Sequence, residues 1–104
     1  MAQRIIALFN LKPGVTPAEY EAWARSVDLP TVRGLKSIDS FTVFRSVGLL
    51  GAEGKPPYQY IEIIDVNDMN VFGQEVAGEV MQKVAGEFRK MVTDLAFIVT
   101  EQIG

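Results

Sequence analysis

Apolar and polar residues alternate in four short stretches of the chain. Residues 3–11 (QRIIALFNL) are β-branched and apolar and end at the turn KPG, a pattern that predicts a strand. Residues 37–47 (SIDSFTVFRSV) and 58–66 (YQYIEIIDV) predict two more strands. The segment GLLGAEGKPP between them is too long for a tight hairpin. Residues 95–103 (LAFIVTEQI) predict the fourth strand.

Residues 16–27 (TPAEYEAWARSV) instead repeat apolar side chains at helical spacing. Thr16 can cap this helix, Pro17 suits its first position, and Glu19 completes a capping box. Its buried stripe is predicted to contain Tyr20, Trp23, Ala24 and Val27.

Residues 69–91 predict a second helix, because apolar residues recur there in steps of three and four. Asp65, Asn67 or Asp68 can cap its N-terminus. Glycines interrupt the pattern, each of which costs up to about 1 kcal/mol in a helix interior. We therefore expect a kink near Gly78.

The order strand, helix, two strands, helix, strand is that of a ferredoxin-like βαββαβ fold. It predicts an α+β protein with a four-stranded antiparallel sheet and two helices on one face, in a single domain over residues 1–104. Strands one and three carry apolar residues on both parities, so both sheet faces need a cover. The sheet of a second copy would supply the other cover and form a dimeric α/β barrel. The alternative is a monomer with an aromatic open face.

The charge pattern argues against several partners. The 104 residues include 10 basic and 13 acidic ones, a net charge of −3, with no basic cluster, so neither nucleic acid nor an anionic membrane is an expected partner. The longest apolar runs are far shorter than the roughly 20 residues that span a bilayer. The N-terminal stretch lacks the features of a signal peptide. With no cysteine for disulfides, we expect a cytoplasmic protein.

The chain also contains no histidine, which excludes Ser-His-Asp and Cys-His catalysis and typical zinc or haem ligation. It has no phosphate-binding glycine motif and no calcium-loop spacing. We expect neither a metal nor a cofactor. Chemistry would rest on carboxylates, Arg, Lys, Tyr, Asn and Trp, or on a ligand that carries its own reactivity.

The strings NLKPGVTPAEYEAWARSVDLPTVRGLKSIDSF, GLLG and PYQYIEIIDVNDMNVFGQEVA resemble the RedY-like proteins of the HapK family. Members are encoded beside the enzymes that make prodiginines, which are red tripyrrole pigments. The resemblance covers nearly the whole chain. It implies a dimeric ferredoxin-like fold and a role in bacterial pigment or other antibiotic-type secondary metabolism. It implies no defined reaction and no catalytic residue set.

Polar residues at positions where the pattern expects apolar ones are candidates for a ligand pocket between the sheet and the helices. In the strands these are Glu62, Arg45 and Asn10. A buried Glu62 would have a raised pKa and could carry a proton, unless Arg45 pairs with it and lowers the pKa. The alternative for both is a structural cross-strand ion pair.

Arg45 could instead bind a substrate carboxylate or enolate, and Tyr58 or Tyr60 could donate a hydrogen bond. We take Glu62, Arg45 and Tyr60 as the candidate catalytic residues. Asn10, Trp23 and Tyr58 are candidates for the pocket wall. Core packing is the favoured alternative for Trp23, because it lies on the helix stripe.

The stretch WARSVDLPTVRGL allows two interpretations of Asp28 and Arg33. Pro30 disfavours a helical Leu29, so Asp28 can cap the short turn LPTVRG, with Arg33 near the negative end of its dipole. We favour this architectural interpretation. The alternative is that Asp28 or Arg33 rims the pocket mouth. In the following loop, residues 48–57, Leu49 and Leu50 are expected to contact a second copy of the chain rather than to cover the pocket as a lid.

These observations favour a small cofactor-independent protein that binds or converts an aromatic ligand, which the family resemblance would make a pyrrole-like intermediate. Proton transfer, isomerisation and condensation suit its side chains, and oxygenation that uses only the substrate and oxygen is also compatible. The alternative is a non-catalytic partner that binds or stabilises a pathway enzyme.

Overall fold

The structure is a computed structural model that describes residues 2–104. Its strands are β1 (Gln3–Leu11), β2 (Ile38–Arg45), β3 (Tyr60–Val66) and β4 (Val92–Thr100). Its helical segments are α1 (Pro17–Trp23), the π-helical turn η1 (Ala24–Asp28), α2 (Leu29–Arg33), α3 (Met69–Val76) and α4 (Glu79–Met91).

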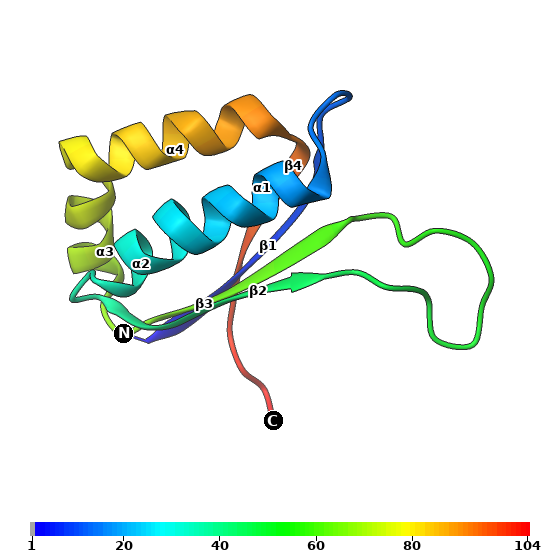
Figure 1. Cartoon of the computed structure of the whole chain (residues 1–104). Helices are drawn as coiled ribbons and strands as arrows, with labels where there is room; N and C mark the ends of the chain where they lie inside the picture. The colour runs from blue at the N-terminus through cyan, green and yellow to red at the C-terminus, as the bar shows by residue number, and fades with distance from the viewer. Residues whose placement is uncertain (1) are drawn as a thin grey trace.

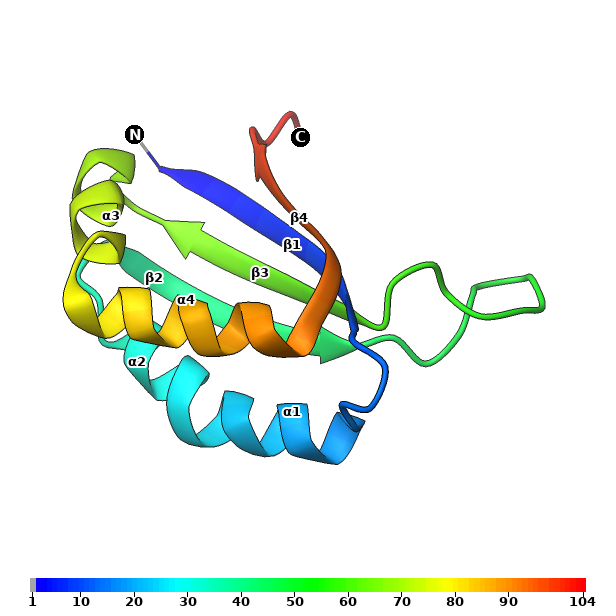
Figure 2. The same ribbon diagram turned by 90° about the horizontal axis from the view of Figure 1, so that it is seen from above.

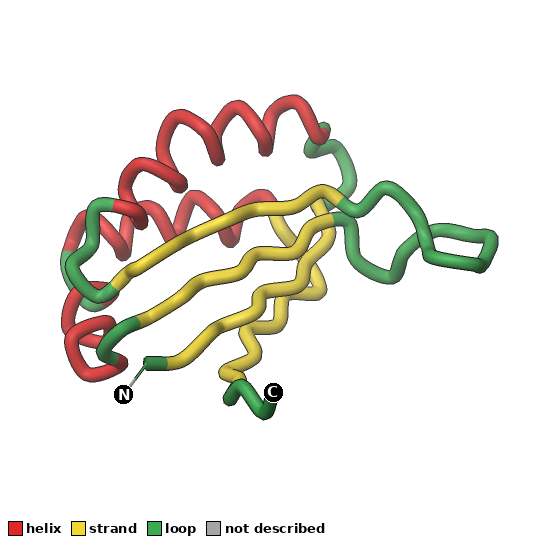
Figure 3. Tube along the Cα trace, turned by 90° about the horizontal axis from the view of Figure 1, so that it is seen from below, coloured by secondary structure: helices red, strands yellow, loops and turns green. Residues whose placement is uncertain are grey.

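The strands form one antiparallel sheet in the order β2-β3-β1-β4, and the helices cover one of its faces (Figures 1 and 2). This is the predicted α+β, ferredoxin-like arrangement. Seen from the opposite side, the sheet is uncovered within residues 2–104 (Figure 3). The predicted pair of helices is confirmed in outline, although each is divided into shorter segments.

The first helical segment begins where the sequence predicts. The Thr16 hydroxyl accepts a hydrogen bond from the Glu19 amide at 3.2 Å, and Pro17 follows at the first helical position. The helix then continues past Pro30, which contradicts the expectation of a break. Leu29 is helical, with φ −58° and ψ −52°, and its amide bonds to the Ala24 carbonyl five residues back. This wider π-turn relieves the crowding that a proline ring causes in a regular α-helix.

The second predicted helix is broken at the expected place. The Asp68 carboxylate caps α3 by accepting from the amides of Asn70 and Val71, at 2.9 and 3.2 Å. Gly78 is extended, with φ −70° and ψ 158°, and separates α3 from α4. The short helix α3 therefore lies across the end of the longer α4 (Figure 2).

Strand β1 shows how the sheet divides its side chains. Ile5, Ala7, Phe9 and Leu11 are buried under the helices, whereas Ile6 and Leu8 are only partly buried on the open face. Their neighbours on that open face are also apolar and include Phe44, Ile61, Ile63 and Ile98. Phe44 and Ile98 are 49% and 45% exposed.

The helices do not reach fully over the edge strand β4. Phe97 pairs with Ala7 and Val99 with Ile5, which places both on the helix-covered face. They nevertheless remain 54% and 53% exposed. The sheet thus has an incompletely covered corner beside β1.

Two buried clusters hold the layers together. One is mainly aromatic and contains Phe9, Tyr20, Tyr60 and Phe88. The other contains Ile5, Val32, Ile38, Phe41, Ile64 and Val66. The loop between β2 and β3 projects away from both (Figure 1), and Leu50 at its tip is fully exposed. No helix within residues 2–104 is long and apolar enough to span a membrane.

Candidate functional site

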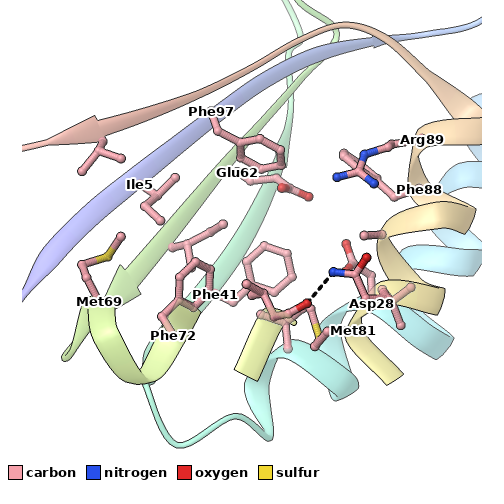
Figure 4. Close-up of a pocket in the computed structure, with 17 residues that line it drawn as sticks. Ile5, Asp28, Phe41, Glu62, Met69, Phe72, Met81, Phe88, Arg89 and Phe97 are labelled. Carbon is pink, nitrogen blue, oxygen red and sulfur yellow. Dashed lines mark hydrogen bonds between the residues drawn. The ribbon is translucent and has the colours of Figure 1, made fainter. Parts of the chain in front are cut away.

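A cavity of about 400 Å³ lies between the sheet and the helices (Figure 4). All four strands, η1, α2, α3 and α4 contribute to its wall. Its apolar lining includes Phe41, Phe72, Phe88, Phe97, Met69 and Met81. The volume is within the range of small-molecule sites.

Strand β3 places one ionisable residue, Glu62, in this apolar wall. Along β3 the burial alternates, so the parity that turns Ile61 and Ile63 to the open face turns Glu62 under the helices. Its side chain is 3% exposed, and Oε2 has no hydrogen-bond partner within residues 2–104. Figure 4 shows the carboxyl group directed into the cavity.

This environment favours the neutral form of Glu62. Burial raises the pKa of Glu62 from 4.5 to about 8, and the negative charge of Asp28 contributes in the same direction. The nearby Tyr20 hydroxyl opposes this shift of the pKa. Glu62 can therefore donate a proton near neutral pH and, once ionised, accept one.

Asp28 lines the same cavity, which the favoured interpretation of the sequence did not predict. It makes no side-chain capping bond, because η1 and α2 form a continuous helical backbone and already use the amides beyond it. The side chain is 6% exposed instead. Burial raises the pKa of Asp28 to about 6, so this carboxyl group is mostly ionised at pH 7.

The Tyr20 hydroxyl is a further polar group without a partner in this region. Tyr20 comes from the buried stripe of α1, and its Oη lies fully buried with no hydrogen bond within residues 2–104. Burial and the charges of Glu62 and Asp28 raise the pKa of Tyr20, which stays protonated. It is a hydrogen-bond donor held near two acceptors.

The other polar wall residues come from α4. Gln82 donates from Nε2 to the Val76 carbonyl at 2.7 Å, the bond that is drawn in Figure 4. Arg89 is exposed to solvent and lies toward the same end of the cavity as the Glu62 carboxyl. Met69, Phe72 and Ile5 line the opposite end, so the cavity has one polar and one apolar end.

A second cavity of about 190 Å³ holds the other two candidate catalytic residues, Arg45 and Tyr60. Both bind Glu21: Arg45 Nη1 lies 2.9 Å from Glu21 Oε2, and the Tyr60 hydroxyl donates to the same oxygen at 2.7 Å. Arg25 adds a third bond at 3.3 Å. These contacts, the Tyr60 bond first, lower the pKa of Glu21.

The cross-strand pair of Arg45 and Glu62 is therefore absent. In the register of the sheet Arg45 lies opposite Tyr60, while Glu62 lies opposite Val43. Arg45 reaches Glu21 on α1 instead. The condition under which Arg45 would lower the pKa of Glu62 is not met.

The remaining predicted site residues lie outside the larger cavity. Asn10 donates to the Pro57 carbonyl and to Asp94, and accepts from the Gln59 amide, which fastens the base of the β2–β3 loop. Tyr58 lies in that loop, just before β3. No residue of 48–57 lines the cavity, so the loop does not close over it.

Trp23 and Arg33 both have structural contacts. Trp23 stacks on Phe88, with ring centroids 6.1 Å apart, and packs against the aromatic cluster, consistent with the core alternative. Arg33 donates from Nε and Nη2 to the Phe41 carbonyl at 3.1 and 3.0 Å. This ties the end of α2 to β2.

Sequence reasoning missed the hydroxyl of Tyr20, the role of Glu21 and the contribution of α3 and α4 to the wall. One signal was present: tyrosine in a buried helix stripe brings a hydroxyl into the core, where leucine or phenylalanine would not. The cavity itself has no sequence signal, because residues from all four strands and from η1, α2, α3 and α4 line it.

The sheet order, the helical layer and the buried carboxyl groups define a ferredoxin-like α+β protein with an acidic cavity beneath its helices. The family described as REDY-like protein HapK matches residues 3–103, and the chain belongs to this family. Among curated proteins no significant match is found.

Solved structures show the same fold. The crystal structure of HapK from Hahella chejuensis is similar with a TM-score of 0.80 and 25% identity, over 100% of this chain and 94% of that one. At3g17210 from Arabidopsis thaliana gives 0.81 at 15% identity, over 98% and 96% of the two chains. A dimeric ferredoxin-like protein of unknown function from Thermobifida fusca gives 0.75 at 17% identity, over 98% and 92%.

Proposed function

We propose that the chain is a small-molecule-binding protein of bacterial secondary metabolism that transfers a proton to or from an aromatic, pyrrole-like intermediate. The carboxyl group of Glu62 is the proton carrier. The proposal needs no cofactor, since the wall of the cavity itself supplies the acid and base groups. The resemblance to the RedY-like proteins supports the type of pathway, including prodiginine-type pigment synthesis.

The observation that carries this proposal is the unpartnered Glu62 oxygen in the wall of a cavity with an apolar lining. A buried carboxyl group without a partner destabilises a fold, so its presence favours a role in binding or catalysis. Asp28 remains ionised beside it and keeps the proton on Glu62 until a ligand removes it. Isomerisation and condensation both begin with such a transfer.

Arg45 and Tyr60 are better explained as parts of the scaffold. Their polar groups bind Glu21, and they line the smaller cavity rather than the larger one. The proposed chemistry therefore uses Glu62, whose protonation is set mainly by burial, with Asp28 raising its pKa and Tyr20 opposing that rise.

Intrinsic Trp23 fluorescence provides a direct test of ligand binding. Trp23 stacks on Phe88, and Phe88 lines the cavity, so a bound aromatic molecule changes the surroundings of the indole indirectly. We expect saturable fluorescence changes with pyrrolic compounds and with bicyclic aromatic compounds. These fluorescence changes should be lost in Glu62→Gln. Saturable binding that is unchanged in this variant would remove Glu62 from the site.

We also propose that the protein is a homodimer joined through its open sheet faces. The apolar side chains of Ile6, Leu8, Ile61, Ile63 and Phe44 on that face support it. So does the similarity to a protein that is described as dimeric. Contacts between two such sheet faces bury apolar area that water would otherwise contact.

Light scattering at micromolar concentration should give about twice the 11.5 kDa mass of the chain. Ile63→Lys should give a monomer, because it places a charge in the middle of the proposed interface. Val80→Lys is the matched control, since Val80 is an exposed apolar residue on α4 and the same charge there should leave the mass unchanged. A monomeric unmodified protein would refute the sheet-face dimer.

A non-catalytic accessory role is the second candidate. The observation that favours it is the projecting loop, where Val47 and Leu50 are almost completely exposed. Such apolar groups suit contact with a pathway enzyme or with the second copy. If the fluorescence test shows no ligand binding and Leu50→Asp abolishes association with an enzyme of the pathway, this role replaces the first.

A further inference from the structure

The larger cavity contains two carboxyl groups that have no cationic partner. Asp28 and Glu62 are 6% and 3% exposed, and no ion pair to either is formed within residues 2–104. One oxygen of Glu62 also lacks any hydrogen-bond donor. The polar end of the cavity therefore offers acceptors and negative charge to whatever enters it.

The opposite charge is present only at the solvent-exposed side. Arg89 belongs to the wall, but it is exposed, and water screens its charge. Buried charges act through a medium of lower effective dielectric constant than exposed ones, so the potential inside the cavity at pH 7 is set mainly by ionised Asp28, and Glu62 adds negative charge once it releases its proton. The Tyr20 hydroxyl, also near these groups, stays neutral.

We infer that the cavity selects ligands that carry a cationic nitrogen on an aromatic body and excludes their carboxylate analogues. This inference rests on the proposed function, because it names the ligand class of the same cavity. The nitrogen would lie between the carboxyl groups of Glu62 and Asp28, at the polar end in Figure 4. The aromatic body would extend toward Ile5, Met69 and Phe72 at the apolar end.

Binding such a cation should change the protonation of Glu62 in a measurable way. At pH 7 the free protein holds a proton on Glu62, and a cationic nitrogen at that position favours the ionised carboxylate. The proton leaves to solvent and the cation replaces it, so charge is balanced within the site. At pH 9 Glu62 is already mostly ionised, and little proton release should accompany binding.

The test is calorimetric titration with three probes that share one aromatic body: 2-naphthylmethylamine, 2-naphthylmethanol and 2-naphthoic acid. We expect the amine to bind about ten- to a hundredfold more tightly than the alcohol, the usual range for a hydrogen bond to a charged group. The acid should bind most weakly. Titrations in two buffers of different ionisation heat should show close to one proton released per amine at pH 7. At pH 9 they should show no net release, because Glu62 is already mostly ionised and the neutral fraction of the amine takes up a proton when it binds as the cation.

Variants separate the cavity carboxyl groups from carboxylates elsewhere. Glu62→Gln should reduce amine affinity to about that of the alcohol and abolish proton release. Asp28→Asn should reduce amine affinity independently, and it serves if Glu62→Gln does not fold. Glu21→Gln is the matched control, because Glu21 is an ionised glutamate of the smaller cavity and its loss should leave amine binding unchanged.

The outcomes distinguish this inference from the function on which it rests. Tightest binding by the acid, lost in Arg89→Gln, would overturn the charge preference and leave a ligand-binding cavity in place. Equal binding of all three probes would also overturn it. No binding of any probe would remove the proposed ligand-binding function together with this inference.

Discussion

Glu21 and Glu62 are chemically identical residues that line two different cavities between the sheet and the helices. Glu21 accepts hydrogen bonds from Tyr60, Arg45 and Arg25, and these contacts lower its pKa. Glu62 has a free carboxyl oxygen, and burial beside Asp28 raises its pKa to about 8. At neutral pH the carboxyl group of Glu21 is ionised, whereas that of Glu62 holds a proton that it can release.

The difference comes from partners rather than from burial alone. Glu21 lies on α1 and meets Arg25 of η1, Arg45 of β2 and Tyr60 of β3. Glu62 lies on β3 and shares the larger cavity with Asp28 of η1. Burial is the main cause of the raised pKa of Glu62, and the charge of Asp28 adds to it, whereas hydrogen bonds and cations lower the pKa of Glu21. This contrast supports the proposal that the larger cavity is the functional one.

The largest expected effect is on function. Glu62→Gln should reduce turnover by at least about a hundredfold, because loss of a general acid or base typically has that scale. Its melting temperature should equal or exceed that of the unmodified protein, since no cation is left without its counter-charge. Measuring both quantities on the same preparation checks this.

The matched variant Glu21→Gln should show the reverse pattern, with function kept and the melting temperature lowered. If Glu62→Gln were instead unstable while function persisted, Glu62 would belong to the scaffold and the contrast between the two glutamates would fail.

The second effect is a pH dependence of stability. Because the pKa of Glu62 is 4.5 in its ordinary state and about 8 when folded, the folded chain retains a proton that the unfolded chain loses. The free energy of unfolding should therefore fall as pH rises from about 4.5 to 8, by an amount on the order of a few kcal/mol. Asp28 adds a similar decline between about 4 and 6.

Thermal melts of the unmodified protein and of Glu62→Gln between pH 4 and pH 9 test this directly. The variant should become progressively more stable than the parent up to about pH 8, and the difference should then level off. A constant difference across this range would show that the folded pKa of Glu62 is not raised.

The fold was largely predictable from the sequence, because alternation and helical spacing are local signals. The first strand was predicted at residues 3–11, the same bounds as β1, and the cap at Thr16 and the break near Gly78 were confirmed. Leu29 was placed wrongly, since the π-turn that lets a helix pass Pro30 depends on packing rather than on a local residue pattern.

The candidate site was predictable only in part, for a physical reason. The sequence marked Glu62 and Arg45 as polar residues in apolar strand patterns, yet their partners depend on which helix lies above each strand. Asp28 was predicted to cap a turn, but it lines the cavity because the helix continues through it. No spacing rule reports such a tertiary contact.

A smaller effect concerns the Tyr20 hydroxyl. Tyr20→Phe removes a buried donor that has no partner, so we expect the melting temperature to stay the same or rise, by the equivalent of up to about 1 kcal/mol. The pKa of Glu62 should rise further, because the hydroxyl opposes the shift. A loss of about 1–3 kcal/mol would indicate instead that the hydroxyl is satisfied in solution, for example through a buried water molecule.

The smallest effect should come from Arg45, which binds Glu21. Arg45→Gln removes one of the cations that bind Glu21, but Arg45 is 60% exposed, and exposed pairs of this kind contribute only about 0–1 kcal/mol. Because the pKa of Glu21 is lowered, its stabilisation is present above its ordinary pKa of 4.5 and is lost as pH falls through the folded value. The melting difference between Arg45→Gln and the parent should therefore be largest near pH 7 and shrink as pH falls through the folded pKa of Glu21, opposite in direction to the Glu62 series. Amine and alcohol affinities should be unchanged, because the larger cavity does not include Arg45. If Arg45→Gln weakened ligand binding tenfold while leaving stability intact, the smaller cavity would be the functional one. Glu62 would then be a buried core residue without a role in function.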